Sequence, residues 1–343
     1  MKIAKRVEFR HNVDFCENGQ RLDILVADRL QNCSRSFAAQ IIRQGYVLVD
    51  GRRCKPSYKV KSKEQIIGQL PTPQPVDLIP ESLDLDILYE DHDVLVINKP
   101  AGMVVHPAAG HDQGTLVHGI LHHCPDLSGI GLEKRPGIVH RLDKETSGVI
   151  LIAKNTHSLH HLARQFKERW VEKKYFALVH GEFLTENGEI DLPIGRHPSD
   201  RKKMSTHSNR PRHALSLWRI SDRFADVSLL EIIIKTGRTH QIRVHCHAIG
   251  HPIVGDSVYR SKGELKRLAQ NRPALFQILK KAKRQMLHAF QITFIHPTKE
   301  ELQTFQASLA EDMADMLKNL RALQSTTPPE SKIQKGLAKA QVD

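Results

Sequence analysis

The chain has 343 residues, enough for two domains, and its 51 Lys and Arg against 38 Asp and Glu give a net charge of +13. This positive charge favours a polyanionic partner, with nucleic acid ranked before an acidic membrane surface. No apolar run is long enough to span a bilayer, no signal-peptide apolar region follows the basic start, and the five scattered cysteines favour a reducing compartment. We therefore expect a cytoplasmic protein with no membrane partner.

Residues 1–70 predict a small basic module. Apolar residues at helical spacing predict one helix over residues 21–30 and a second through residues 37–42, which Gly45 ends. Residues 46–51 predict a strand that enters an Asp-Gly turn. The module carries exposed basic residues for which phosphate contact is the expected use, and its candidate RNA-binding residues are Arg35, Arg43, Arg52 and Lys55.

Several short motifs in this module resemble the alpha-L RNA-binding domain, which is shared with a small-subunit ribosomal protein. They are Arg21-Leu22-Asp23, Ser34-Arg35-Ser36, the run from Gly45 to Gly51, and Lys55-Pro56-Ser57. The family pattern usually closes with Gly-Asp, where this chain has Ser62-Lys63-Glu64. The alternative is a basic helical module with another kind of partner.

The middle of the chain predicts a linker and then a second domain. Four prolines within residues 71–84 indicate the linker, and strands follow at residues 87–89 and 94–98 around a turn. Further strands are expected at residues 148–153, 175–180, 215–220, 227–234 and 292–297. This density of strands and turns favours an α+β catalytic domain over residues 85–319 that is rich in antiparallel strands, followed by a disordered tail over residues 320–343.

Two segments beside these strands are also informative. A helix is expected from Thr156, with Leu159, Leu162, Phe166 and Trp170 on one face. Residues 196–212 hold six basic residues and one acidic residue among Pro, Ser and Asn, which predicts an exposed basic loop. The candidate RNA-backbone contacts in this loop are Arg201, Lys202 and Lys203.

The most polar loop of the chain directly precedes the buried strand at residues 148–153. It contains His140-Arg141-Leu142-Asp143-Lys144, and a rigid strand can hold such a loop still. Asp143 lies between Arg141 and Lys144, which favour its ionised form, so it can act as a nucleophile or a base. The alternative is a turn residue in a surface salt bridge.

Other chemistries find less support. Some histidines are spaced as metal ligands could be: His118 with His122, His157 with His161, and His240, His245 and His247 near Cys246. A zinc site needs three or four ligands and usually a carboxylate, and neither a His-Glu-x-x-His motif nor a Cys pair occurs, so a metal site is disfavoured. No phosphate loop or Gly-x-Ser-x-Gly elbow occurs. Asp143 and Glu145 would face opposite ways in an extended loop, which disfavours a carboxylate pair. A single carboxylate suffices to cleave an N-glycosidic bond to uracil, because the departing base spreads its negative charge over two carbonyls.

The motifs resemble those of the RluA-type pseudouridine synthases. The resemblance covers residues 85–300, through Val96 to Gly102, His140 to Gly148, Lys173 to Gly181, Thr236 to Arg243, and Leu287-His288-Ala289. It implies a mixed, mainly antiparallel sheet with flanking helices. It also implies the catalytic residues Asp143, Tyr175 and Arg243, and the substrate-binding residues Arg141, His140, Lys99, Leu287 and Arg238. Arg243 would pair with Asp143, Tyr175 would stack on the uracil and help to remove its C5 proton, and Arg141 would fill the gap left by a flipped base.

We therefore expect an isomerase that converts uridine to pseudouridine in RNA, with no cofactor and no metal, acting as a monomer. The N-terminal module favours large-subunit ribosomal RNA, free or within a precursor particle. The alternatives are a transfer-RNA pseudouridine synthase, a non-catalytic RNA-binding factor for ribosome assembly, and a metal-dependent RNA hydrolase. Intact Asp143, Tyr175 and Arg243 oppose the non-catalytic factor, and activity retained in excess chelator would exclude the hydrolase.

Overall fold

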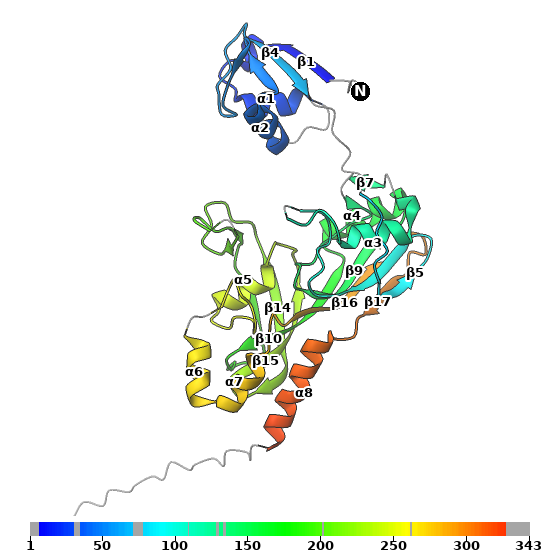
Figure 1. Cartoon of the computed structure of the whole chain (residues 1–343), viewed down its shortest axis with the longest axis vertical. Coiled ribbons are helices and arrows are strands. Elements are labelled where there is room, and N and C mark those ends of the chain that lie inside the picture. The colour runs from blue at the N-terminus through cyan, green and yellow to red at the C-terminus, as the bar shows by residue number, and fades with distance from the viewer. Residues whose placement is uncertain are drawn as a thin grey trace, which may run out of the picture. The chain divides into compact units, whose positions relative to one another are not determined.

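The computed structural model of the chain divides into two compact units, residues 1–76 and 77–343 (Figure 1). It describes residues 7–30, 35–70, 78–108, 110–127, 130–132, 135–200, 202–260 and 263–326. The division falls inside the linker predicted over residues 71–84, of which residues 71–77 lie outside the described part. Residues 78–84 differ from that prediction and belong to the larger unit. The Glu81 N–H donates to the His118 carbonyl at 3.1 Å, and the Glu81 carboxylate accepts from the Gly114 N–H at 3.0 Å.

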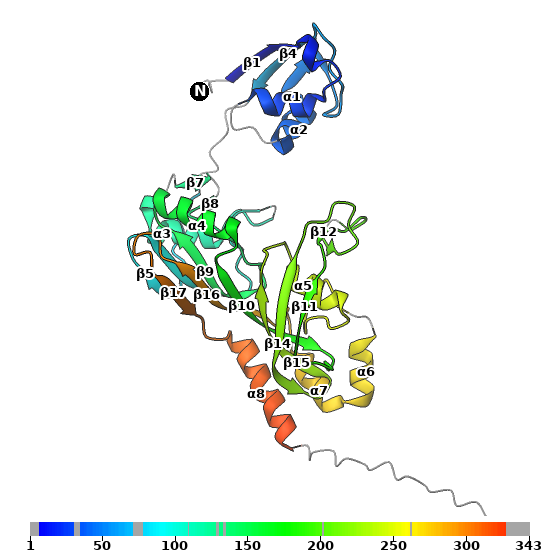
Figure 2. The ribbon, with the colours of Figure 1, turned by 180° about the vertical axis from the view of Figure 1, so that it is seen from behind.

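The smaller unit contains the two expected helices, α1 (Leu22–Arg29) and α2 (Arg35–Gln44). They share a core with a four-stranded antiparallel sheet, in which Leu22, Ile41 and Val47 are buried together. Figure 2 shows this unit from behind. In order across the sheet, the strands are β1 (Val7–Asn12), β4 (Gln65–Leu70), β2 (Val47–Val49) and β3 (Arg52–Arg53). The outer strand β1 was not predicted, and Ser34, part of one quoted motif, lies outside the described residues.

Two turns of this unit need left-handed backbone. Asp50 and Gly51 have φ values of 46° and 74°, as expected for a tight Asp-Gly hairpin turn between β2 and β3. Lys63 has a φ of 75° within Ser62-Lys63-Glu64, the segment that stands where the alpha-L pattern usually closes with Gly-Asp. The Glu64 carboxylate accepts bonds from the Tyr58 hydroxyl at 2.6 Å and from the Lys61 N–H at 2.8 Å. These bonds brace the turn.

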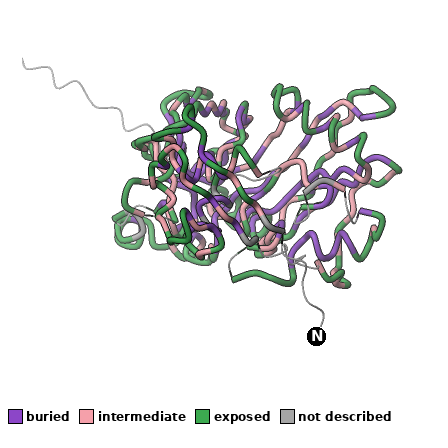
Figure 3. The backbone as a smooth tube through the Cα atoms, turned by 90° about the horizontal axis from the view of Figure 1, so that it is seen from above, coloured by how far each residue is buried: buried purple, intermediate pink, exposed green. Residues whose placement is uncertain are grey.

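The larger unit is built on a nine-stranded, mainly antiparallel sheet, which confirms the predicted α+β class (Figure 1). Seven of the strands run in the order β11 (Asn187–Asp191), β14 (Leu215–Phe224), β15 (Val227–Ile234), β10 (Glu172–His180), β16 (Leu287–Ile295), β9 (Ser147–Ala153) and β6 (Val94–Lys99). The edge strand β5 (Ile87–Glu90) follows β6, and β17 (Leu302–Gln306) pairs with β16. In Figure 3 the buried backbone lies inside and the exposed turns lie around it.

The junction between β9 and β16 sits at the middle of this sheet. Here the strands pair in parallel, with His288 opposite Ser147 and Ala289 opposite Gly148. Gly148 has a φ of 110°, and a Cβ atom there would collide with the backbone of Ala289. Only glycine therefore allows β16 to approach the start of β9, and that start directly follows the loop that carries Asp143.

Helices flank the sheet, and most of them were not predicted. α4 (Thr156–Glu168) is the expected one, and the others are α3 (Leu116–His123), α5 (Gln241–Ala248), α6 (Glu264–Asn271), α7 (Pro273–Leu279) and α8 (Glu311–Thr326). The basic loop at residues 196–212 includes a small hairpin of β12 (Gly195–Arg196) and β13 (Met204–Ser205). Among the described residues, no helix is both long and apolar enough to cross a membrane.

Two details of the larger unit differ from the sequence-based expectations. Trp170 lies beyond the end of α4 and is 54% exposed, because Arg169 adopts the left-handed conformation that ends the helix. The disordered tail predicted from residue 320 begins too early, since α8 continues to Thr326 and buries Leu317 and Leu320 against the core. Residues 327–343, the rest of that prediction, lie outside the described residues.

Candidate active site

Asp143 lies in the loop between β8 (Arg135–Pro136) and β9. Its backbone carbonyl accepts the Thr146 N–H at 3.0 Å, which closes a turn just before the strand begins. All seven residues of β9 are buried. The loop is therefore attached to one of the most rigid strands of the sheet, as the sequence predicted, and the Asp143 side chain remains partly exposed.

Lys99 holds this loop in place from the protein interior and does not line an open pocket. Its side chain is fully buried, and Nζ donates to the carbonyl oxygens of Pro100 at 2.7 Å, Met103 at 3.0 Å and Lys144 at 3.2 Å. An ammonium group has three donors, so these bonds use all of them. Burial lowers the pKa of Lys99 to about 7. The prediction that Lys99 binds substrate is wrong, because its buried ammonium holds backbone carbonyls instead.

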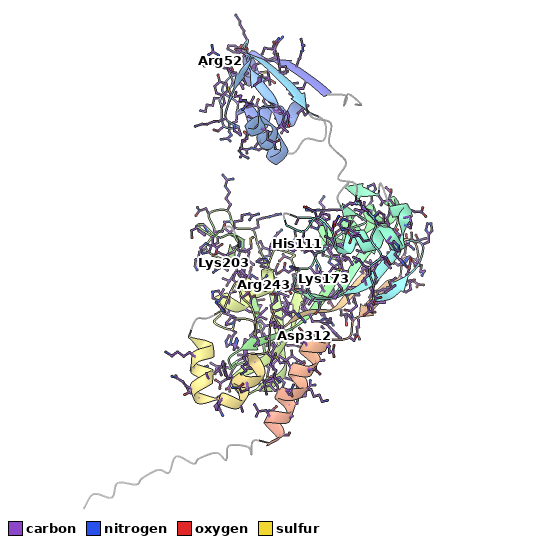
Figure 4. All side chains as sticks on the ribbon, viewed as in Figure 1. Arg52, His111, Lys173, Lys203, Arg243 and Asp312 are labelled. Carbon is purple, nitrogen blue, oxygen red and sulfur yellow. The ribbon has the colours of Figure 1, made fainter. Side chains whose placement is uncertain are left out.

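A chain of ion pairs fixes the Asp143 carboxylate. Arg243 on α5 donates from Nη1 to Asp143 Oδ2 at 2.9 Å. On its other edge it donates from Nε and Nη2 to Asp256 at 2.7 and 3.0 Å, a bidentate pair. The Arg243 side chain is 6% exposed and that of Asp256 is fully buried. Burial opposes the charge on Arg243, but the two carboxylates raise its pKa further above its ordinary value. Figure 4 labels Arg243 in the larger unit.

A second set of contacts surrounds this pair. The Arg243 guanidinium lies 5.1 Å from the centre of the Tyr259 ring, and the Tyr259 hydroxyl bonds to His240 Nδ1 at 2.9 Å. The same hydroxyl accepts the backbone N–H of Met204 in β13 at 2.8 Å. His240 Nε2 lies 3.8 Å from Asp143 Oδ2, too far for a hydrogen bond. Through Tyr259, the basic hairpin is thus connected to residues beside the Asp143 carboxylate.

The loop before α5 is held by its own hydrogen bonds. Gln241 Oε1 accepts from the Thr236 hydroxyl at 2.7 Å and from the Arg238 N–H at 3.0 Å. His240 caps the helix with a φ of 56°, a conformation that non-glycine residues seldom adopt. A strained residue held this firmly beside a polar pocket is typical of a functional site.

Asp143, His240 and Arg243 line a pocket of about 100 Å³, which we call the Asp143 pocket. Tyr175 on β10 and Leu287 on β16 supply its apolar wall, together with Ile242. Burial, and then the negative charge of Asp143, raise the pKa of Tyr175 well above its ordinary value. The phenol is therefore protonated in the free site, which opposes a role as a base there.

A second cavity of about 430 Å³ adjoins the first, and we call it the basic cavity. The two share Arg141, Tyr175 and Arg238 as lining residues, so they are neighbours. Of the described residues that line the basic cavity, none is acidic, and its cations come from separate elements: Arg141, Lys167, Arg169, Lys173, Arg212, Lys235 and Arg238. Of these cations, only Arg141 and Arg238 were predicted to bind substrate.

The other expected substrate residues lie in or beside these two cavities. Arg141 is exposed, and Arg238 donates from Nε to the His213 carbonyl at 3.0 Å. His140 lines only the basic cavity, where its Nε2 accepts the Leu151 N–H at 2.9 Å and its ring stacks on Phe166 at 4.9 Å. Burial lowers the pKa of His140 to about 3, so it is neutral at physiological pH.

The residues expected to contact the RNA backbone lie on the surface, with the exception of one that is outside the described residues. Arg35, Arg43, Arg52 and Lys55 are exposed on the smaller unit, although Arg35 also pairs with Asp23 at 3.1 Å. In the basic hairpin Lys202 is exposed and Lys203 half-buried, and Arg201 lies outside the described residues. Figure 4 labels Arg52 and Lys203.

A buried arginine attaches the end of the Asp143 loop to the C-terminal helix. Arg284 donates to the Glu145 carbonyl at 3.0 Å and forms a bidentate pair with Asp312 at 2.7 and 2.6 Å. Asp312, labelled in Figure 4, is in the first turn of α8. The helix that the sequence analysis missed therefore helps to fix the loop that carries Asp143.

The histidines considered as metal ligands do not converge in the described part of the chain. His118 bonds to the Thr115 hydroxyl at 2.9 Å, and His245 bonds to Ser216 and to the Leu192 carbonyl, both at 2.9 Å. Two other groups of potential ligands lie within reach of a shared ion, Glu90 with His123 and Cys124, and Asp91 with Asp93 and His296. Glu90 already pairs with Lys154 at 2.7 Å, and Asp91 with Lys299 at 3.1 Å, so both groups are explained as ion-pair networks.

Sequence reasoning missed Asp256, Tyr259 and most cations of the basic cavity. Asp256 follows Gly255, which has a φ of 78° and no space for a Cβ beside the Arg284 backbone. A glycine in a tight turn followed by aspartate was visible in the sequence, but the buried arginine that it faces was not. His240 was considered only as a candidate metal ligand, and its place beside the Asp143 carboxylate was not predicted.

The site and the sheet together define an RNA-modifying enzyme class. The family model described as RNA pseudouridylate synthase matches residues 93–248, which include Asp143, Tyr175 and Arg243, and an S4 domain model matches residues 20–66. Ribosomal large subunit pseudouridine synthase D of Pseudomonas aeruginosa is 39% identical over 319 residues, covering 93% of this chain and 98% of that protein. The chain belongs to the RNA pseudouridine synthase family, whose members are isomerases.

Other relatives agree with this membership. The protein described as uncharacterized RNA pseudouridine synthase YlyB of Bacillus subtilis is 43% identical over 305 residues, covering 89% of this chain and 95% of that protein. The solved structure of human RNA pseudouridylate synthase domain containing 4 is 28% identical, with a TM-score of 0.52, and covers 68% of this chain and 92% of that chain. The predicted family, its fold and the N-terminal RNA-binding module are thereby confirmed.

Proposed function

We propose that the chain isomerises uridine in large-subunit ribosomal RNA, with Asp143 as the catalytic carboxylate. The observation that carries this proposal is the buried chain of ion pairs from Asp256 through Arg243 to Asp143, which ends at the Asp143 pocket. A carboxylate held in this way is ionised and oriented before substrate arrives, which avoids reorganisation during the reaction. We also propose that the chain acts as a monomer, because it supplies both the ion-pair chain and the lining of the Asp143 pocket by itself.

In the proposed reaction the base leaves, turns and rejoins the same ribose. Asp143 attacks C1′ of the ribose or removes its 2′ proton, and both routes need the same ionised oxygen. The departing uracil carries its negative charge on its carbonyl oxygens and rejoins C1′ through C5. This step frees Asp143, either by displacing it from C1′ or with return of the 2′ proton to C2′. C5 then loses its proton to solvent and N1 takes one up, so no net proton is gained or lost. The Tyr175 ring lies in the wall of the pocket and is placed to stack on the base. Its raised pKa favours this stacking role over the proton-accepting role that the resemblance implied.

Uridine can reach the pocket only when it is extruded from its stack. Extrusion costs a few kcal/mol, which the protein must offset. Arg141 is exposed and lines both cavities, so its long side chain is available to occupy the gap that the base leaves. Leu287 supplies an apolar surface for the base, and Arg238 a charged rim.

The choice of large-subunit ribosomal RNA rests on the relatives and on the smaller unit. Relatives from Neisseria meningitidis and Pseudomonas aeruginosa bear the name ribosomal large subunit pseudouridine synthase D. The smaller unit matches the S4 domain and exposes Arg43, Arg52 and Lys55, which suit phosphate contacts.

The test is a map of pseudouridine in ribosomal and transfer RNA by mass spectrometry. Cells would carry the native gene, a deletion, Asp143→Asn, or Asp84→Asn as a matched change at an exposed aspartate. We expect specific large-subunit sites to vanish in the deletion, to return with Asp84→Asn and to stay absent with Asp143→Asn. Restoration by Asp143→Asn would contradict the assigned carboxylate, and a loss confined to transfer RNA would overturn the ribosomal substrate.

A further inference from the structure

The basic cavity is an uncompensated cluster of positive charge beside the Asp143 pocket. Its cations include Arg169 at the end of α4, Lys173 on β10 and Lys235 just after β15, so three separate elements bring charge to one place. Bringing like charges together in a partly buried cavity costs free energy unless an anion binds there. The fold therefore maintains a site that is complete only with a negatively charged ligand.

Lys173 shows this most clearly. It is half-buried, its Nζ lies 5.3 Å from the centre of the Phe166 ring, and among the described residues no carboxylate lies within ion-pair distance of it. Burial, followed by repulsion from Lys235, lowers the pKa of Lys173 to about 8. An ammonium in these surroundings still has its donors available, in contrast to the fully bonded Lys99.

The neighbouring residue Lys174 provides a natural contrast. Its Nζ lies 3.5 Å from the Glu172 carboxylate, and it lines a separate cavity with Arg219 and Glu231. Two adjacent lysines on one strand thus differ in their surroundings. Lys174 is paired with an acid, whereas the charged residues that line the cavity around Lys173 are all cations.

We propose that the basic cavity is a phosphate subsite, in which Lys173, Lys235 and Arg169 bind a backbone phosphate next to the extruded uridine. This inference rests on the proposed function, because the adjoining Asp143 pocket must hold the uracil. When a nucleotide leaves its stack, its flanking phosphates move with it, and the cavity shares Arg141 and Tyr175 with the pocket. A phosphate carries no base identity, so this subsite positions the strand and leaves sequence choice to other contacts.

The subsite has a consequence for catalysis. Binding energy from a phosphate that does not react can hold C1′ against Asp143, so the cavity contributes positioning as well as affinity. Removing one cation should therefore raise KM and also lower kcat, because C1′ is then held less firmly against Asp143. The salt dependence of RNA binding should also become shallower, by about 0.7 to 0.9 in the logarithmic slope per lost contact.

The experiment is a double-mutant cycle. It removes the positive charge of the lysine from the protein and the negative charge of one phosphate from the RNA. The protein is the full chain as native, Lys173→Gln, Lys173→Arg or Lys174→Gln, and the RNA carries a neutral methylphosphonate linkage at each position around the mapped uridine. Equilibrium binding is the main readout, and KM and kcat are measured in parallel. For the native chain we expect one neutral linkage beside the uridine to weaken binding about tenfold. For Lys173→Gln, the same linkage should cost clearly less than tenfold, because only Lys235 and Arg169 then remain to contact that phosphate.

The control variants decide the interpretation. Lys174→Gln should keep the full tenfold effect, Lys173→Arg should keep most of it, and thermal unfolding should show all variants folded. Equal losses for Lys173→Gln and Lys174→Gln, or additive effects at every linkage, would overturn the phosphate subsite. Binding cycles remain measurable in a chain without isomerase activity, so failure of the proposed function and failure of the subsite give different results.

Discussion

The two adjoining cavities of the larger unit differ in whether their charged side chains have partners of opposite charge. In the Asp143 pocket the Asp143 carboxylate has a fixed charged partner, because Arg243 lies between Asp143 and Asp256. In the basic cavity, Lys173 and its neighbours face one another without an acid among the described lining residues. On the proposals made above, the first arrangement would fix a reactive group before substrate arrives, and the second would be completed by the substrate. The difference would then separate the part of the site that serves chemistry from the part that serves binding.

The largest effect is expected where the compensated charges are broken. Arg243→Met removes the partner of two carboxylates and leaves Asp256 buried without a counter-ion. We expect a loss of about 3–5 kcal/mol in the free energy of unfolding and at least a loss of about a hundredfold in activity. Urea unfolding and single-turnover isomerisation of the mapped RNA measure the two effects.

The double variant Arg243→Met with Asp256→Leu separates stability from catalysis. Replacing both members of a buried ion pair by apolar residues restores most of the stability, because no fully buried charge is left unpaired. Activity should stay low, since Asp143 still lacks its partner. A double variant that regained both stability and activity would show that the ion-pair chain serves folding alone.

The residues to which the chemistry is assigned could be predicted from the sequence, but the buried residues that hold them in place could not. Asp143 and Arg243 lie 100 residues apart and were both predicted, because each belongs to a long local motif. Asp256 was missed and Lys99 was misassigned because burial and long-range contacts leave no local pattern. The cations of the basic cavity come from the ends of separate elements, so only the folded sheet brings them together.

The same limit applies to the fold. Strong strands such as β9 and β15 were predicted from continuous β-branched runs. The helix α8 was missed, and part of it was taken as the tail. Its apolar residues pack against α7 and the sheet, so tertiary contacts support a segment whose own sequence is mostly polar.

A smaller effect on stability is expected from the protonation of His140, which lines the basic cavity. This prediction tests whether the charge of the cavity changes with pH. Its folded pKa of about 3 lies below the ordinary value of 6.5, so the unfolded chain binds the additional proton. This contribution to stability is complete well above pH 6.5 and is lost as the pH falls towards 3. Between pH 7 and 5.5 the loss should be about 1 kcal/mol.

His140→Gln tests this assignment. The Gln side chain can still accept the Leu151 N–H but does not titrate. Urea unfolding at several pH values should show a shallower decline for this variant than for the native chain below pH 6.5. Parallel declines would mean that His140 titrates normally in the folded protein, and the basic cavity would then gain charge at mildly acidic pH.

The smallest effect is expected for Lys173→Met. Its change in the free energy of unfolding should have the opposite sign to that of Arg243→Met. Lys173→Met keeps an apolar stem beside Phe166 and removes a charge that burial and Lys235 disfavour. We expect the free protein to become more stable by about 0.5–1 kcal/mol, as is common where binding residues are replaced.

This gain should depend on pH. In the native chain Lys173 loses its proton near pH 8 when folded but only near pH 10.5 when unfolded. The penalty is therefore present below pH 8, and the advantage of Lys173→Met should shrink as the pH rises from 8 towards 10.5. Lys174→Met, which removes a lysine paired with Glu172, should give no such gain in parallel urea titrations. If Lys173→Met destabilised the chain at pH 7, the stem packing would outweigh the repulsion. The basic cavity would then be a structural feature and not a site waiting for phosphate.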